Sequence, residues 1–169
     1  MSDTLDGSSG GTTAFRLLQR PGCGFELLGA ETIKVVPARA AWEVHGGRLA
    51  DRCRVEPTAG SRGYRLVNAD ASWMGSASSL CGGEIGADPR SLLLADGALY
   101  RLIRSACGFD LLSWEVAASY AAWRRREGQW CFDTNAAGDD LPGIEEIAIL
   151  SAVMIVAEEA DESNEPDEN

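Results

Sequence analysis

The sequence has very few of the residues that most often carry chemistry. It contains one histidine, His45, and one lysine, Lys34, in 169 residues. Its five cysteines lie 24 to 30 residues apart, and no two form a Cys-x-x-Cys pair. Zinc sites need close sets of Cys and His, so the sequence predicts none. It also contains no glycine-rich phosphate loop, nucleophile elbow or His-Glu-x-x-His motif. We therefore expect no cofactor, and the sequence favours a non-enzymatic function.

Long apolar segments and targeting signals are also missing. Residues 1–13 are mostly Gly, Ser, Thr and Asp, without the basic and apolar regions of a signal peptide. The longest apolar run, residues 147–157, has 11 residues, whereas a membrane-spanning helix needs about 20. Neither end carries a lipidation motif. These features predict a cytoplasmic protein with free thiols and no transmembrane segment.

Positive charge is scarce as well. The chain has 15 basic and 26 acidic residues and a net charge of -11. Two of the acids precede residue 14 and seven follow residue 157, which leaves 17 acids against 15 bases between them. Because no large basic field surrounds this central region, the sequence argues against nucleic-acid binding and predicts weak or no binding to membrane surfaces.

The central region has the pattern of many short strands separated by turns, which is typical of an all-β sandwich or barrel. Gly46-Gly47 and Asp96-Gly97 are sequences typical of two-residue hairpin turns. Residues 69–90 are harder to interpret, with Trp73 and Ile85 as expected anchors of short strands. Elsewhere we expect strands over residues 14–19, 24–28, 32–36, 41–45, 48–56, 64–67, 91–95, 98–104, 109–116 and 129–134.

Residues 117–126 fit either a helix or a strand. Leu112, Val116, Tyr120 and Trp123 have helical spacing, yet every second residue from Trp114 onward is also apolar. We predict a strand, because the segment is short and both of its neighbours are expected strands.

The apolar run near the C-terminus predicts one helix, over residues 142–157. Pro142 is tolerated in a first helical turn, and Glu145 and Glu146 suit the positive end of the helix dipole. A helix that is apolar on every face must be surrounded by protein or lipid. Since about twelve strands closed into a barrel leave room along the axis, we predict a closed β-barrel around this central helix. We expect residues 1–13 and 158–169 to form disordered tails, the second acidic, and residues 14–157 to form the domain.

This order of elements resembles the tubby C-terminal-like superfamily, which includes tubby proteins, phospholipid scramblases and LURP-one-related proteins. The resemblance is carried by Trp130-Cys-Phe-Asp-Thr, by Asp139-Asp140-Leu141-Pro142 and by the apolar run 147–157. It implies a 12-stranded barrel around a central helix and a function in binding. The basic phosphoinositide site of tubby proteins includes Lys, and with Lys34 alone this chain does not carry that site over. The proline-rich N-terminal segment and palmitoylated cysteines of scramblases are also missing.

Two groups of residues are candidate sites. Arg124, Arg125 and Arg126, together with Trp123 and Trp130, could hold a phosphate or a phospholipid head group. The alternative is a solvated hairpin tip beside core aromatics, since three adjacent strand residues cannot all face one way.

The second candidate is the connector between the last strand and the helix. Asp133, Asn135, Asp139 and Asp140 gather oxygen ligands of the kind that calcium prefers. The segment begins like an EF-hand loop but has Ile144 where the bidentate Glu belongs. An Asx- and Gly-rich turn before a helix explains the same residues without a metal.

The sequence thus favours a tubby-like or scramblase-like binding module whose ligand is a protein or a phospholipid head group. The alternative is a barrel-type carrier or enzyme with a pocket at the mouth of the barrel. His45 is expected to be a turn residue rather than part of a catalytic pair.

Overall fold

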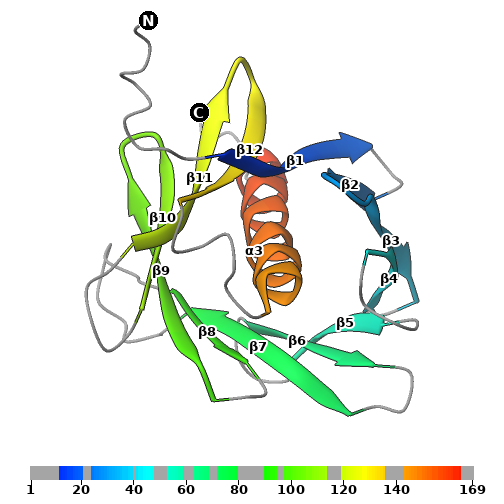
Figure 1. Ribbon diagram of the computed structural model, residues 1–169. Coiled ribbons are helices and arrows are strands. Elements are labelled where there is room, and N and C mark those ends of the chain that lie inside the picture. The colour runs from blue at the N-terminus through cyan, green and yellow to red at the C-terminus, as the bar shows by residue number, and fades with distance from the viewer. Residues whose placement is uncertain are drawn as a thin grey trace, which may run out of the picture.

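The computed structural model shows a closed β-barrel with one helix along its axis (Figure 1). It describes residues 12–20, 24–39, 41–47, 53–58, 63–68, 72–79, 90–94, 97–113, 119–135 and 143–164. The barrel is mainly antiparallel β-structure, as the sequence predicts, and each strand pairs with its neighbours in chain order until β1 closes the ring on β12. The strands are β1 (Thr12–Arg20), β2 (Gly24–Leu28), β3 (Ile33–Ala38), β4 (Ala41–Gly46), β5 (Cys53–Pro57), β6 (Gly63–Asn68), β7 (Trp73–Ser79), β8 (Arg90–Leu94), β9 (Leu99–Ser105), β10 (Gly108–Ser113), β11 (Ser119–Arg126) and β12 (Gln129–Thr134).

Every second residue of a strand points into the barrel, because successive side chains of a strand point to opposite faces. In β2, for example, Phe25 and Leu27 are buried whereas Glu26 pairs with Arg20 on the outside. The inward side chains of the strands form a single core cluster with the helix. The strand prediction for 117–126 is confirmed over its described part, since β11 covers 119–126.

The helix α3 (Ile144–Asn164) fills the axis of this barrel. Its residues from Ile147 to Ile155 are all buried, and it lies closest to β6, β7 and β8. Gly75 favours this close approach, since an added Cβ there would make a tight contact of 3.3 Å with Leu150 Cδ1. The segment of the helix that has no polar face is therefore buried inside the protein, as a helix of this kind must be.

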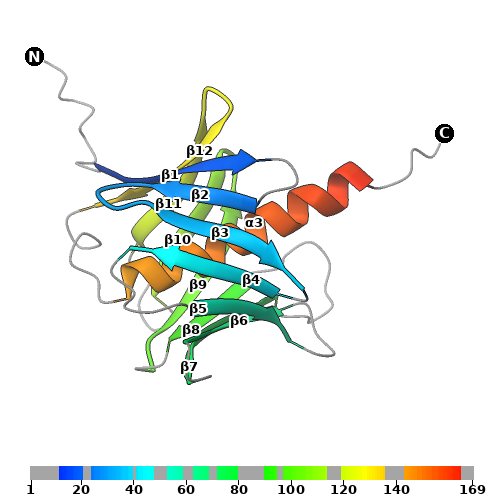
Figure 2. The same cartoon turned by 90° about the vertical axis from the view of Figure 1, so that its right-hand side faces the viewer.

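The ends of the helix differ from the prediction. It begins at Ile144 rather than at 142, because Gly143 has a positive φ of 79° and its carbonyl accepts the first helical hydrogen bond, from Ile147. At the other end it continues through Asn164 and projects beyond the strands (Figure 2). The expectation of a disordered tail from 158 is therefore wrong as far as Asn164, and that of a tail over 1–13 is wrong for Thr12 and Thr13, which belong to β1.

The predicted two-residue turn at Gly46-Gly47 is also wrong. Strand β4 pairs Val44 with Cys53, so residues 47–52 lie between β4 and β5. Both glycines have positive φ, and an added Cβ on Gly46 would lie 2.3 Å from the Thr32 carbonyl oxygen. The glycine pair is thus needed where the chain leaves β4 close to β3, rather than for a tight hairpin. The turn predicted at Asp96-Gly97 lies where β8 passes to β9, with the Gly97 N–H donating to the Leu94 carbonyl.

One polar contact lies inside this apolar core. The fully buried Trp123 donates its indole N–H to Ser151 Oγ at 2.8 Å, and the Ser151 hydroxyl donates to the Ile147 carbonyl at 2.6 Å. A buried indole N–H needs a partner, and Ser151 supplies the only hydroxyl in the helix segment 147–157. The contact therefore joins β11 to the helix and fixes the rotation of the helix about its own axis.

We expect Ser151→Ala to destabilise the domain by about 1–3 kcal/mol, because it leaves the Trp123 N–H buried without an acceptor. Urea unfolding of the full chain measures this loss. In a Trp123→Phe background, where no N–H remains, the same change should cost much less. Equal costs in both backgrounds would show that packing of Ser151, and not the hydrogen bond, is responsible.

Candidate functional site

The three consecutive arginines of β11 point in alternate directions. Arg124 pairs with Asp110 of β10 at 2.7 Å, and Arg126 pairs with Asp133 of β12. Between them, Arg125 reaches the helix and pairs with Glu159 at 2.9 Å. This is the alternation expected of adjacent strand residues, so the triplet does not form one basic surface.

Trp123 lies on the core side of the same strand. It is fully buried, packs against Phe132 with ring centroids 4.9 Å apart, and bonds to the helix. Trp123 therefore does not belong to a surface site with Arg124 and Arg126. Trp130, by contrast, lies beside the Arg125 guanidinium, which is 5.4 Å from the centre of its ring.

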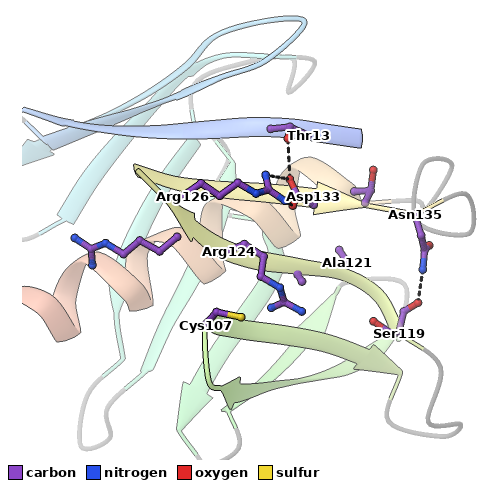
Figure 3. A pocket seen from close by; sticks show the side chains of 11 residues that line it. Thr13, Cys107, Ser119, Ala121, Arg124, Arg126, Asp133 and Asn135 are labelled. Carbon is purple, nitrogen blue, oxygen red and sulfur yellow. Dashed lines mark hydrogen bonds and ion pairs between the residues drawn. The ribbon is translucent and has the colours of Figure 1, made fainter. Parts of the chain in front are cut away.

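A surface depression of about 530 Å³ lies over β11 and its neighbours (Figure 3). Arg126 and Thr13 both reach Asp133 on one side of it, and the Asn135 amide donates to the Ser119 carbonyl at its end. The residues that line the depression are Thr13, Cys107, Ser119, Ala121, Ala122, Arg124, Arg125, Arg126, Asp133, Thr134 and Asn135.

The positive charge at this depression is matched by carboxylates. The hydrogen bond that Arg126 donates to Asp133 raises the pKa of Arg126 above its usual value, because the carboxylate favours the charged guanidinium. Asp110 and Glu159 similarly face Arg124 and Arg125. An incoming anion would have to displace a carboxylate already in place, which makes this a poor site for a phosphate group.

The predicted calcium connector is partly used for other contacts. Asp133 accepts hydrogen bonds from Thr13 and Arg126, and Asn135 bonds to Ser119. Asp139 and Asp140 lie outside the described residues. In the part of the chain that the structure describes, no group of three or more His, Cys, Asp or Glu side chains is placed to hold a metal ion.

Glu159 is a residue that the sequence did not single out. Its carboxylate accepts hydrogen bonds from Gln19 of β1 at 3.1 Å, from Arg125 of β11 at 2.9 Å and from Trp130 of β12 at 2.9 Å. It therefore anchors the C-terminal part of the helix to three neighbouring strands. The sequence did hold one indication that the helix reaches Glu159. Ala and Glu favour helix, and no Gly or Pro interrupts residues 158–164.

The opposite mouth of the barrel, where the helix begins, has a smaller hollow of about 280 Å³. It brings Glu31 of the β2–β3 turn near Glu145 of the first helical turn, with Phe15 and Ile144 as its larger apolar residues. Two carboxylates and few other polar groups make this hollow unsuited to an anionic ligand. The alternative predicted from the sequence, a barrel-type carrier or enzyme with a pocket at the barrel mouth, would have to use this hollow.

Comparison with known proteins identifies no relative: no family model, no curated protein and no solved structure matches the chain. Among the described residues, no helix combines the length and the apolar character that crossing a membrane requires.

Proposed function

We propose that this chain is a non-enzymatic binding module of the tubby-like and scramblase-like type, and that its ligand is another protein. The observation that carries the proposal is the filled barrel. The helix residues Ile147–Ile155 are buried among the inward side chains of the strands. Ligand carriers of barrel type hold their ligand in the space that the helix takes here. A ligand therefore has to meet the outer wall or the rims.

Two further observations support this function. The barrel with a C-terminal central helix is the architecture that the resemblance to tubby and scramblase domains implies. The sequence favoured two classes of ligand, a protein and a phospholipid head group. Of these, a protein is better supported. Each of the three arginines that could hold a head group already has a carboxylate partner, in Asp110, Glu159 or Asp133.

We expect negligible binding of the full chain to vesicles that contain anionic phospholipid at physiological salt, with or without calcium. Peripheral attraction contributes only about 1 kcal/mol for each well-placed Lys or Arg, and these arginines are already paired. Flotation of vesicles with the protein measures the binding. Any residual binding should fall when Arg124, Arg125 and Arg126 are changed together to Ser.

Two outcomes would contradict the proposal. One is strong vesicle binding that survives both the triple change and high salt. The other is saturable, one-to-one uptake of a fluorescent long-chain fatty acid by the folded protein, which would favour the carrier alternative. The control for the fatty acid titration is the Leu150→Asp variant, in which the core is disrupted. It separates specific uptake by the folded protein from binding to unfolded chain.

A further inference from the structure

The rim of the barrel where α3 leaves it holds one carboxylate with donors from three strands. Glu159 Oε1 accepts a hydrogen bond from the Gln19 side-chain amide of β1 at 3.1 Å. Glu159 Oε2 accepts two more at 2.9 Å each, from the Arg125 guanidinium of β11 and from the Trp130 indole N–H of β12. Both oxygens of the carboxylate are therefore bound, and the three donors form a site whose chemistry suits a carboxylate group.

These donors are placed by the barrel and not by Glu159. Each stands two residues along its strand from a core residue and faces the inside of the barrel, since Leu17, Trp123 and Phe132 are buried. The Trp130 ring packs against the buried Phe109, with ring centroids 5.9 Å apart. The Arg125 guanidinium in turn lies 5.4 Å from the centre of the Trp130 ring. The indole and the guanidinium thus have contacts that keep them in place when Glu159 leaves.

Glu159 belongs to the part of α3 that is least suited to be a helix. The buried segment of the helix ends at Ile155 and is followed by two partly buried residues, after which the helix projects beyond the strands (Figure 2). Residues 158–164 contain four acidic and no basic residues. Acidic side chains oppose the negative end of the helix dipole, and Glu158 and Glu162 stand four positions apart, where like charges repel.

The ion pair that holds this extension is open to water. The Arg125 side chain is 52% exposed and that of Glu159 is 30% exposed, and a pair so exposed contributes little to stability. Asp110 and Asp133, which face the other two arginines of β11, lie instead on strands that are paired on both sides. Of the three carboxylates, Glu159 is therefore the one that can leave its arginine without opening the barrel wall.

We propose that Gln19, Arg125 and Trp130 bind an Asp or Glu side chain of the partner protein, and that Glu159 occupies this site until the partner binds. This inference rests on the proposed function and names the site and the chemical group that it takes. When the extension of α3 leaves the rim, its four acidic residues leave with it. The partner segment then contacts the rim and the uncovered Trp130 ring, and Glu159 acts as an internal competitor.

The donors define this ligand, and no surplus of positive charge is needed. Arg20 at the end of β1 pairs with Glu26. Arg126 pairs with Asp133, and Glu127 in the turn between β11 and β12 is acidic. The barrel itself hardly repels an acidic segment, because residues 14–157 hold 17 acids against 15 bases. A phosphate head group would displace the bound carboxylate through one charged group alone, whereas a protein segment adds further contacts along the rim.

Removal of Glu159 tests the proposal, because it should raise the affinity for the ligand. A random peptide library displayed on phage is selected on the full chain that carries Glu159→Ala. We expect the selected peptides to be enriched in Asp and Glu. Synthetic copies should bind Glu159→Ala about tenfold more tightly than the unchanged chain, since the internal competitor is absent. Replacing the acids of the peptides by Asn and Gln should remove this difference.

Three further variants separate the site from its surroundings. Arg125→Gln in the Glu159→Ala background should weaken the peptides about tenfold, because it removes the charged donor. Arg124→Gln is its matched control and should leave the affinity unchanged, since Arg124 faces Asp110 instead of the rim. Glu162→Ala takes the same charge from the same extension, and it should not raise the affinity as Glu159→Ala does.

The Trp130 indole N–H reports on the site directly. Its nuclear magnetic resonance signal, identified by its loss in Trp130→Phe, should shift in Glu159→Ala and shift again when a peptide binds. Circular dichroism and thermal unfolding of each variant show whether the fold is kept. We expect it to be kept in Glu159→Ala, because the buried core lies outside this contact.

The proposal is overturned if the peptides bind Glu159→Ala and the unchanged chain equally well, or if Arg125→Gln leaves their affinity unchanged. Either result would leave a protein-binding module with a different surface. The proposal also fails if no peptide is selected on Glu159→Ala, or if vesicles of anionic phospholipid bind this variant through Arg125 while the peptides do not. Failure to select any peptide, together with uptake of the fatty acid, would overturn the proposed function itself.

Discussion

Replacing Leu150 with aspartate should unfold the domain. Leu150 is fully buried in the helix segment Ile147–Ile155 and lies close to Gly75 of β7, where an added Cβ would come within 3.3 Å of Leu150 Cδ1. An unpaired carboxylate there costs several kcal/mol, which is comparable with the whole stability of a domain of about 5–15 kcal/mol. Loss of the cooperative unfolding transition and of near-ultraviolet circular dichroism measures the effect.

The same substitution on the outer wall provides the control for Leu150→Asp. Leu93 lies on β8, which pairs with β7 beside Gly75, but its side chain is 37% exposed. We expect Leu93→Asp to cost less than about 1 kcal/mol, because the carboxylate stays hydrated. A Leu150→Asp protein with an unchanged melting temperature would mean that the helix does not lie inside the barrel.

The second large effect is expected for Gly108→Ala, at the start of β10. Gly108 has a φ of 152°, and an added Cβ would lie 1.8 Å from the carbonyl oxygen of Trp123 on β11. The β10 and β11 backbones would have to separate beside Arg124, which pairs with Gly108 in the strand register. We expect a loss of about 3 kcal/mol or more in the free energy of unfolding, measured by urea denaturation.

Gly128→Ala separates the two causes of this loss. Gly128 lies in the β11–β12 turn with a φ of 80°, but nothing lies within 4 Å of an added Cβ. It should cost only the backbone strain, about 1–2 kcal/mol. If the two variants lose equal stability, the close approach of β10 and β11 is not the reason that Gly108 is required.

The arginine triplet shows why local sequence misleads about this site. Three adjacent arginines next to aromatic residues are a reasonable prediction for an anion site when only the chain order is known. In the barrel they contact Asp110, Glu159 and Asp133, which come from three different elements. Their contact partners are 7 to 34 residues away in the sequence. No local pattern could have indicated that all three charges are matched.

The exposed side chains of Trp73 and Leu93 were missed for a related reason. Trp73 belongs to a segment that the sequence described only as an expected short strand, and Leu93 is one of three consecutive leucines in β8. The alternation of β8 decides that the middle leucine faces outward, but the sequence alone does not show which face is the core. Strand pairing then places Leu93 beside Ser76 and, through Ser76, beside Trp73.

The sequence by itself determined the class of the fold. Short strands between turns and one uncharged run of 11 residues, all apolar except Ser151, leave few ways to cover that run with protein, and a barrel around a helix is one of them. Periodicity and turn residues act locally, so they are legible in the chain. Only the tertiary structure decided where charge and exposed apolar surface lie. Those depend on the register of twelve strands and on the rotation of the helix, which Ser151 and Glu159 join to the wall through contacts distant in sequence.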